Sequence, residues 1–301
     1  MAPNETTISG NIPAVVTPFD DTGRIDIAAF NELVQWHLER GVDGICVAGD
    51  NGESWSLSFD ERKLIANEAA RTIDGRVPLI VGATATGNQE SAGHAVMALQ
   101  AGADAILLMP QTYVLKASQS ELVARFALVA DAADIPIIFY NSPRRAGIDI
   151  SMEQLSAVCD VAPVIGIKES SRDFFHTTHL LEHFGERISV FIGPCHFILP
   201  GIALGAAGFI ATGPELLPAE SMRGIIAVGR ETPGPDYAKL HYQLTGLYET
   251  LMGLGTWPAS LKAALALMGQ PAGVPREPIL PLDADAVAKL RTALIRIGVV
   301  A

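Results

Sequence analysis

Short apolar runs alternate with amphipathic segments along most of the chain. The runs are nearly continuous rather than alternating apolar and polar, which is typical of strands buried on both faces. Eight of them predict strands, at residues 12–19, 44–48, 78–82, 105–109, 137–140, 164–168, 190–193 and 208–211. The segments between them have helical periodicity and predict helices at residues 27–40, 58–73, 88–101, 118–132, 152–159, 174–184 and 196–204.

A strict alternation of strands and helices favours a parallel sheet, and eight equivalent units favour an α/β fold of the closed (β/α)8 TIM barrel type. An open, doubly wound sheet is the alternative. After the eighth strand the pattern is helical only, at residues 219–228, 236–253, 258–268 and 283–297. We therefore expect a barrel that carries the catalytic site over residues 1–213 and a C-terminal helical extension over residues 214–301.

The composition fits a globular protein with an ample core. Of the 301 residues, 49% are hydrophobic and 18% charged, and the net charge of -12 argues against nucleic acid or an anionic membrane as a partner. The three cysteines are far apart and show no CxxC spacing, so neither disulfides nor a zinc site is indicated. The sequence begins without a leader pattern and has no apolar run long enough to span a membrane, so a cytoplasmic protein is expected.

One charged residue ends an apolar run. Lys168 follows Val164, Ile165, Gly166 and Ile167, where an ammonium group is costly to desolvate unless it is paired or has lost its proton. A neutral lysine amine attacks carbonyl carbons and forms a Schiff base. The alternative is a lysine that only extends from the strand end into solvent. The residues expected near Lys168 decide between the two.

Active sites of such barrels lie at the carboxyl ends of the strands, so the residues that close each run are candidates. These residues are Thr17 after the first run, residues 49–53 after the second, Tyr140 and Arg145 after the fifth, Lys168 after the sixth and Ile210 after the eighth. A nucleophilic lysine, a tyrosine and an arginine would therefore face one pocket.

These residue types suit the chemistry of a 2-oxo acid bound to an amine. Imine formation requires a proton shuttle beside the amine, and the phenol of Tyr140 is suited to that role. The carboxylate of the acid requires a guanidinium, such as that of Arg145, or the backbone amides of a glycine-rich turn, such as residues 49–53. The protonated imine draws electrons from the adjacent carbon, so the predicted lyase needs neither a cofactor nor a metal.

Three short motifs carry a resemblance to a known family. A YNSP segment at residues 140–143 precedes a GIKE segment at residues 166–169, and a GxxGE turn occupies residues 49–53. With these segments in this order, the chain resembles the dihydrodipicolinate synthase/N-acetylneuraminate lyase family of Schiff-base-forming barrels from residue 12 to about residue 212.

The resemblance assigns roles to single residues. It implies that Lys168 is the Schiff-base lysine, that Tyr140 relays protons and that Arg145 contacts a substrate carboxylate near the mouth of the site. Ile210 matches a position whose backbone carbonyl faces the substrate. Because the family assembles as tetramers, the resemblance also implies a homotetramer, built as a dimer of dimers, with a small 2-oxo acid as its substrate.

The chain departs from the synthase at two sites. The synthase has GTTGE after the second strand, and its two threonines relay protons and hold the carboxylate of pyruvate; this chain has Asp50 and Asn51 there. An ionised aspartate cannot donate, so a catalytic Asp50 would act as a base or remain protonated, and the alternative is a turn cap. We expect a catalytic Asp50, with Asn51, Gly52 and Thr17 binding substrate. In the longer loop after the fourth strand, Tyr113 is expected to replace the aromatic residue that neighbouring subunits exchange, or else to pack locally.

These departures leave the exact reaction open. We expect a class I lyase or aldolase that forms a Schiff base with pyruvate or another 2-oxo acid and catalyses aldol addition, aldol cleavage or dehydration. The alternatives are the 4-hydroxy-tetrahydrodipicolinate synthase reaction itself, a hydroxy-pyrroline-carboxylate deaminase, and a 2-oxo-acid binder without turnover. A binder has no need of a nucleophilic amine, so Lys168, Tyr140 and Arg145 together favour an enzyme.

Other candidate ligands and nucleophiles are weaker. His176, His179 and His183 have a spacing that suits a metal, but the helix is expected to point His179 and His183 away from the strand ends, so surface histidines and no metal site are predicted. Cys195 and His196 are adjacent in sequence rather than opposed across a pocket, so a thiol nucleophile is not expected.

Overall fold

The computed structural model describes residues 8–114 and 116–300. Its parallel sheet consists of β1 (Gly10–Asn11), β2 (Ile45–Val47), β3 (Leu79–Gly82), β4 (Ala105–Leu108), β5 (Ile137–Asn141), β6 (Val164–Glu169), β7 (Ser189–Ile192) and β8 (Gly208–Phe209). From β2 to β8 each strand pairs with the next, and β8 pairs with β1. A parallel bridge between Ala14 and Cys46 joins the first segment to β2 and closes the barrel. The predicted (β/α)8 fold is confirmed, and the open sheet is excluded.

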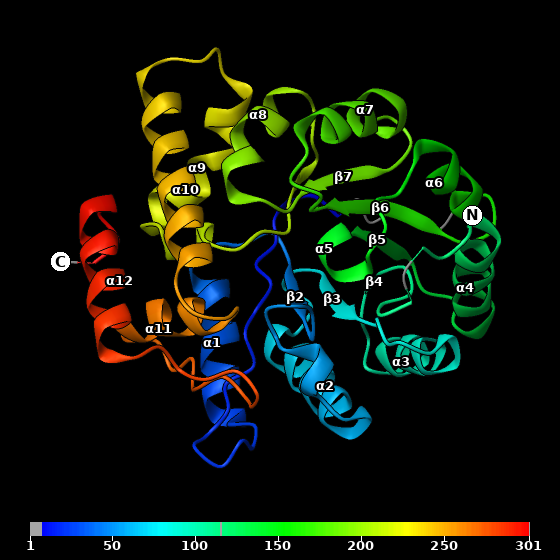
Figure 1. The fold of residues 1–301 in the computed structure, drawn as a ribbon, viewed down its shortest axis with the longest axis horizontal. Helices are drawn as coiled ribbons and strands as arrows, with labels where there is room; N and C mark the ends of the chain where they lie inside the picture. The colour runs from blue at the N-terminus through cyan, green and yellow to red at the C-terminus, as the bar shows by residue number, and fades with distance from the viewer. Residues whose placement is uncertain (1–7, 115, 301) are drawn as a thin grey trace.

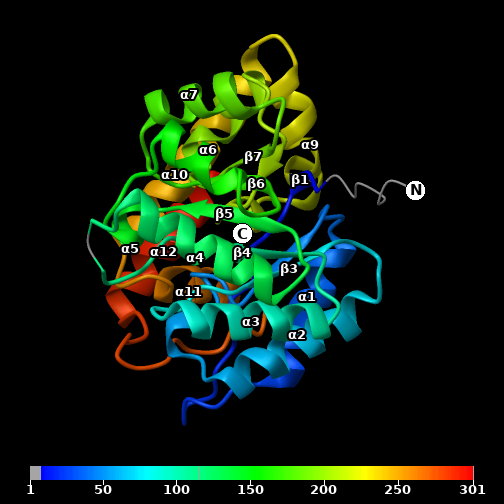
Figure 2. The ribbon, with the colours of Figure 1, turned by 90° about the vertical axis from the view of Figure 1, so that its right-hand side faces the viewer.

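Helices cover the outside of the barrel. They are α1 (Ile27–Glu39), α2 (Phe59–Ile73), α3 (Asn88–Gln100), α4 (Gln119–Ala132), α6 (Met152–Cys159), α7 (Phe174–Phe184), α8 (Ile198–Ala203) and α9 (Ala219–Arg230) (Figure 1). The short helix α5 (Pro143–Ala146) instead follows β5 at the carboxyl ends of the strands. Figure 2 shows α2, α3 and α4 outside β3 and β4. Capping boxes at Ser58, Ser118 and Ser151 explain where α2, α4 and α6 begin, because each serine accepts a backbone hydrogen bond that the first turn cannot satisfy.

The strands are covered by apolar side chains on both faces, because successive residues point to opposite sides. In β4, Ala105 and Leu107 pack in the barrel interior, whereas Ile106 and Leu108 pack in the larger layer between sheet and helices. The same alternation in β5 turns Tyr140 into the interior. Burial on both faces is why the strands are continuous apolar runs in the sequence.

The first strand differs from the prediction. Regular pairing covers Gly10–Asn11 instead of residues 12–19. Beyond it the chain bonds to β2 through only two backbone contacts, Val15 N–H to the Cys46 carbonyl and Cys46 N–H to the Pro13 carbonyl. Proline has no N–H, so a regular ladder cannot continue through Pro13. The predicted helix 196–204 likewise begins as a 3-10 turn, Cys195–Phe197, before α8.

Three further helices follow the barrel: α10 (Pro235–Gly253), α11 (Ala259–Leu267) and α12 (Ala284–Ile297). α9 packs against α8 and β1 and so takes the eighth place in the ring of helices. α10 and α12 pack side by side, with α11 against both (Figure 1). α10 also contacts the Cys195–Phe197 turn beside β7, which brings the extension to the strand ends. The division at residue 213 stays a prediction.

None of the helices in the described ranges has the length and apolar content that a membrane span requires.

Candidate active site

Lys168 and Tyr140 lie side by side at the carboxyl ends of two neighbouring strands. The parallel register of β5 and β6 sets Tyr140 opposite Lys168. Each residue is only 6% exposed, and the Nζ of Lys168 lies 4.3 Å from the centre of the Tyr140 ring. Within residues 8–114 and 116–300, no carboxylate is ion-paired with Lys168. The amine is therefore buried next to a phenol and not neutralised by an acid.

The turn after β2 is held by the side chain of Asn51. Its amide nitrogen donates to the carbonyl of Ala14 at 2.9 Å and to the hydroxyl of Thr212 at 2.6 Å. Its oxygen accepts from the indole nitrogen of Trp257 at 3.2 Å. Every hydrogen-bonding end of the amide is thus engaged, so Asn51 links the first, second and eighth strand ends to the C-terminal region.

The backbone of the same turn has unused donors. The hydroxyl of Thr17 donates to the carbonyl of Gly52 at 2.8 Å, which supports the turn from behind. The backbone N–H groups of Asn51 and Gly52 have no hydrogen-bond acceptor among the residues that the structure describes. Two free N–H groups in a glycine-containing turn suit an anion such as a carboxylate.

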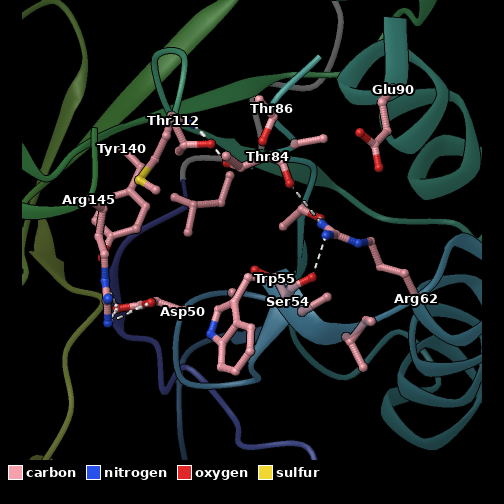
Figure 3. Close-up of a pocket in the computed structure, with 17 residues that line it drawn as sticks. Asp50, Ser54, Trp55, Arg62, Thr84, Thr86, Glu90, Thr112, Tyr140 and Arg145 are labelled. Atoms are coloured by element: carbon pink, nitrogen blue, oxygen red, sulfur yellow. Dashed lines mark hydrogen bonds and ion pairs between the residues drawn. The ribbon is translucent and has the colours of Figure 1, made fainter. Parts of the chain in front are cut away.

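Asp50 is paired with Arg145. The guanidinium donates to one carboxylate oxygen through Nε at 3.2 Å and through Nη2 at 3.1 Å. The Asp50 side chain is 18% exposed and that of Arg145 38% exposed. Figure 3 shows the two side chains facing each other across the gap between the turn after β2 and the segment after β5. Two converging hydrogen bonds fix the orientation of the carboxylate.

Two cavities meet at Asp50. The smaller one, of about 60 Å³, contains Lys168. The larger one, of about 330 Å³, lies toward β2, β3 and β4, and its polar lining includes Ser54, Arg62, Thr84, Thr86, Glu90 and Thr112 (Figure 3). Asp50 and Tyr140 line both cavities, so these two side chains form the partition between them.

The structure gathers most of the predicted site residues. Those that line the cavity with Lys168 are Tyr140, Asp50, Asn51 and Ile210. Thr17 and Gly52 are bonded to each other in the supporting turn, and Arg145 lines the neighbouring cavity. Tyr113 is apart from them: it is 90% exposed, has a left-handed φ of 70°, and lines neither cavity.

Several cavity residues were not predicted from the sequence. Tyr248, Met252 and Trp257 come from α10 and the segment after it and form part of the lining. No pattern distinguishes them from residues that pack in a helical core. Arg172 also lines the cavity. Arg172 could have been predicted, because it lies only four residues after Lys168 in the loop that follows the sixth strand.

A buried polar network lies behind Lys168. Glu169 is 1% exposed, accepts from Nδ2 of Asn141 at 2.8 Å and from the Ser171 N–H at 2.6 Å, and lies 3.2 Å from Nδ1 of His176. Burial opposes a charge on His176, but the hydrogen bond to Glu169 and its negative charge, with the Ile150 carbonyl, raise the pKa of His176 to about 9. The prediction of a surface His176 is wrong, because the first turn of α7 directs this side chain onto β6.

Glu53, the last residue of the GxxGE turn, faces the C-terminal region. It is completely buried and pairs with Lys262 of α11 at 2.6 Å. The Nζ of Lys262 also donates to the carbonyls of Thr17 and Val274, both at 2.7 Å, and the Arg276 N–H donates to Glu53 at 2.9 Å. Burial lowers the pKa of Lys262 to about 8, against the raising effect of Glu53. The network anchors the turn after β2 to the extension.

The cysteines and the exposed histidines of α7 do not contribute a nucleophile or a metal ligand to the two cavities. Burial raises the pKa of Cys46 to about 11 and also raises the pKa of Cys195, so neither thiol ionises readily. His179, Glu182 and His183 form a cluster with metal-type spacing on α7, but all three are exposed and none lines either cavity.

A closed barrel with a buried lysine and tyrosine at neighbouring strand ends is an arrangement that suits a class I lyase, an enzyme that acts through a lysine Schiff base. The chain belongs to the dihydrodipicolinate synthetase family, whose pattern it matches over residues 7–297. Members of this family are class I aldolases and lyases that act on pyruvate and other 2-oxo acids, and the predicted family and enzyme class are confirmed.

Relatives and solved structures agree along the whole chain. The 4-hydroxy-tetrahydrodipicolinate synthase of Nitratidesulfovibrio vulgaris (strain DP4) is 32% identical over 292 residues, which cover 97% of this chain and 99% of the relative. The dihydrodipicolinate synthase from Acinetobacter baumannii, solved with pyruvate, has a TM-score of 0.89 at 29% identity, with 98% of this chain and 100% of that chain covered. CdNal from Clostridium difficile, solved with mannosamine, has a TM-score of 0.89 at 22% identity over 97% and 100% of the chains, a likeness of fold alone.

Proposed function

We propose that Lys168 forms a Schiff base with pyruvate or another 2-oxo acid and that the protein catalyses aldol addition, aldol cleavage or dehydration from this adduct. The observation that carries the proposal is the burial of Lys168 against Tyr140 in a cavity at the strand ends. Membership of a family that acts on 2-oxo acids supports it.

The chemistry begins at the amine. The lone pair of Lys168 Nζ attacks the keto carbon; the nitrogen then gives up one proton and the keto oxygen takes one up, which gives a neutral carbinolamine. The hydroxyl group is protonated in turn and leaves as water, which gives the iminium ion. Tyr140, whose ring lies 4.3 Å from Nζ, is the proposed relay for these protons. The iminium ion draws electrons from the adjacent carbon, where a bond or a proton is then gained or lost.

Asp50 is the proposed base for the second half of the reaction. As a carboxylate held by Arg145 it accepts a proton but does not donate one. It lines the same cavity as Lys168, so a substrate hydroxyl or an acidic C–H beside the iminium is its expected partner. Removing a hydroxyl proton starts aldol cleavage, and removing the C–H proton starts dehydration.

The carboxylate of the 2-oxo acid is proposed to bind the turn after β2. The free backbone N–H groups of Asn51 and Gly52 supply the donors, and Thr17 keeps the turn in place through its bond to Gly52. Ile210 lines the opposite part of the cavity and is proposed to present its backbone carbonyl to the adduct.

Arg145 and Tyr113 are proposed to act at the rim. Arg145 orients Asp50 and is the sequence-based candidate for contact with a substrate carboxylate at the mouth. Tyr113 is 90% exposed, and we propose that it is covered by a neighbouring subunit in a homotetramer built as a dimer of dimers. Light scattering tests this assembly: a tetramer that loosens in Tyr113→Ser supports it, and a monomeric wild-type protein contradicts it.

The condensation catalysed by 4-hydroxy-tetrahydrodipicolinate synthase is a second candidate reaction. It is favoured by relatives of that name, which are 32% identical over 97% of this chain. Asp50 and Asn51, where the synthase has a pair of threonines, count against it, because neither replaces a hydroxyl that both donates and accepts.

Borohydride trapping tests the Schiff base directly. Pyruvate and sodium borohydride are expected to leave a reduced adduct on Lys168, located by peptide mass spectrometry. Lys168→Ala should gain no mass, whereas Lys63→Ala, which removes an exposed lysine of α2, should still be labelled. A wild-type protein that takes up no label overturns the proposal.

A substrate screen separates the reactions. The panel contains 2-oxo acids, tested alone, with aldehydes and with aspartate semialdehyde. It also contains pyrrolines derived from hydroxyproline. Pyruvate release or consumption marks an aldolase, loss of water a dehydratase, ammonia a deaminase, and condensation with the semialdehyde the synthase. Trapping at Lys168 without turnover of any compound would indicate a binder.

A further inference from the structure

We propose that Arg172 binds a second, distal carboxylate of the substrate within the cavity of Lys168. The substrate class is then a 2-oxo acid, or an adduct of one, that carries an anionic group beyond the reacting carbons. The inference rests on the Schiff-base function proposed for Lys168 and adds to it the part of the substrate that does not react.

Arg172 is held in the cavity by an aromatic ring. Its guanidinium carbon lies 5.0 Å from the centre of the Tyr248 ring, which α10 supplies. Stacking on a ring leaves the N–H groups at the edge of the guanidinium available for acceptors. The Nη2 nitrogen is buried and has no hydrogen-bond partner in the part of the chain that the structure describes. A buried donor without an acceptor is unfavourable, so the hydrogen-bonding capacity of this guanidinium is not used up by the protein.

The backbone also favours a specific position for Arg172. Its φ of 66° lies in the left-handed region, which residues with a Cβ seldom adopt and which glycine adopts without strain. The strained residue sits in the short loop between β6 and α7, so its place relative to Lys168 is fixed by the strand. Strain of this kind persists where the surrounding structure needs a particular side chain in a particular place.

The side chains that line the cavity carry a net positive charge, which favours an anionic ligand. Arg144, Lys168 and Arg172 line it together with a single carboxylate, that of Asp50, which is already paired with Arg145. In the described residues, no carboxylate is ion-paired with Arg144 or Arg172. The whole chain carries a net charge of -12, so this cationic lining is a local exception. The turn after β2 is the proposed binding site for the first carboxylate of a 2-oxo acid. The arginines are therefore available to bind a second carboxylate.

Arg172 is better placed for this role than Arg145. Arg145 commits two of its donor nitrogens to Asp50 and lines the neighbouring cavity rather than the one that contains Lys168. Arg172 lines the Lys168 cavity, and no carboxylate in the described residues is ion-paired with it.

The test compares acids of equal chain length with and without a second carboxylate. Borohydride trapping on Lys168 is measured against concentration for 2-oxoadipate and 2-oxohexanoate, and for 2-oxoglutarate and 2-oxopentanoate. In the wild-type protein we expect half-maximal trapping at a concentration about tenfold lower for the preferred diacid than for its matched monoacid, as one charge-assisted hydrogen bond predicts. In Arg172→Gln the ratio should fall toward one, and Arg172→Lys, which keeps the charge, should restore part of it.

Arg187→Gln is the matched control. Arg187 is exposed after α7 and also stacks on a ring, at 5.3 Å from the centre of Phe184, so its loss removes a stacked arginine outside the site. A wild-type protein that traps pyruvate but does not prefer either diacid overturns this inference and leaves the Schiff-base proposal standing. Loss of the preference in Arg145→Gln but not in Arg172→Gln also overturns it. A wild-type protein that traps no acid at all overturns the proposed function itself.

Discussion

Single residues determine which half of the reaction each variant should affect. In the proposed mechanism Lys168 and Tyr140 act in imine formation, and Asp50 acts in the step after it. The separation matters because trapping on Lys168 reports the first half alone, whereas turnover reports both. Variants of Tyr140 and Asp50 are therefore expected to differ in these two measurements.

Tyr140→Phe keeps the ring against Lys168 and removes the phenol. We expect kcat to fall by about 10²-fold or more, because the proton relay in imine formation and hydrolysis is lost. The initial rate of borohydride trapping should fall with it. Tyr242→Phe, at an exposed position of α10, is the matched control. Equal rates in Tyr140→Phe and the wild-type protein would remove the phenol from the mechanism.

Asp50→Asn keeps the size of the side chain and removes the base. Trapping on Lys168 should persist, whereas kcat should fall by about 10²-fold or more because the proton that leaves the adduct has no acceptor. Asp134→Asn, at an exposed position, controls for the loss of one negative charge. If Asp50→Asn abolishes trapping as well, Asp50 acts before the imine and the proposed division of roles is wrong.

At the scale of elements, the ion pair of His176 with Glu169 joins α7 to β6 behind the lysine. The pKa of His176 is raised from 6.5 to about 9 in the folded protein, so the pair stabilises the fold fully below about pH 6.5 and this contribution is lost as the pH rises through about 9. His176→Gln should therefore lower the free energy of unfolding most at acidic pH, and its difference from the wild-type protein should shrink above pH 9.

Urea unfolding at a series of pH values measures this difference. His183→Gln, at an exposed position of the same helix, is the control and should follow the wild-type curve. A difference that grows with pH would mean that the charged form of His176 is not the one that stabilises the fold.

The elements also show what a sequence can predict here. Strand β6 was predicted because its Val and Ile are buried on both faces, and the strand-end rule then paired Lys168 with Tyr140. The first strand was misplaced because Pro13 breaks a ladder that hydrophobicity alone suggests. His176 was taken for a surface residue because its partner Glu169 lies on another element, and helical spacing carries no information about such a partner.

At the scale of the whole molecule, the buried pair of Glu53 and Lys262 ties the C-terminal helices to the barrel. Lys262→Met should destabilise the protein by about 3–5 kcal/mol, because it leaves Glu53 charged and unpaired in the interior. Lys289→Met, at an exposed position of α12, should have little effect. The double variant Glu53→Gln with Lys262→Met is expected to recover part of the loss, and thermal unfolding of all four proteins measures it.

The contacts between the C-terminal helices and the barrel could not be predicted from the sequence. Trp257 bonds to Asn51 across 206 positions of the chain, and Lys262 bonds to Thr17 across 245. Such contacts depend on how the completed helices dock, and no local pattern encodes them. The barrel and the pairing of Lys168 with Tyr140 were therefore predictable from short segments, whereas the wall that Tyr248 and Trp257 add to the cavity was not.

The bond between Trp257 and Asn51 also bears on the order in which the protein matures during synthesis. A nascent chain leaves the ribosome from its N-terminus, so Lys168 and Tyr140 are available to fold well before Tyr248 and Trp257 have been made. Until they arrive, Asn51 lacks one of its partners and the lysine lacks part of its enclosure. The cavity that contains Lys168 is therefore complete only when the C-terminal helices dock, and a chain that ends before them keeps the amine without the side chains that enclose it.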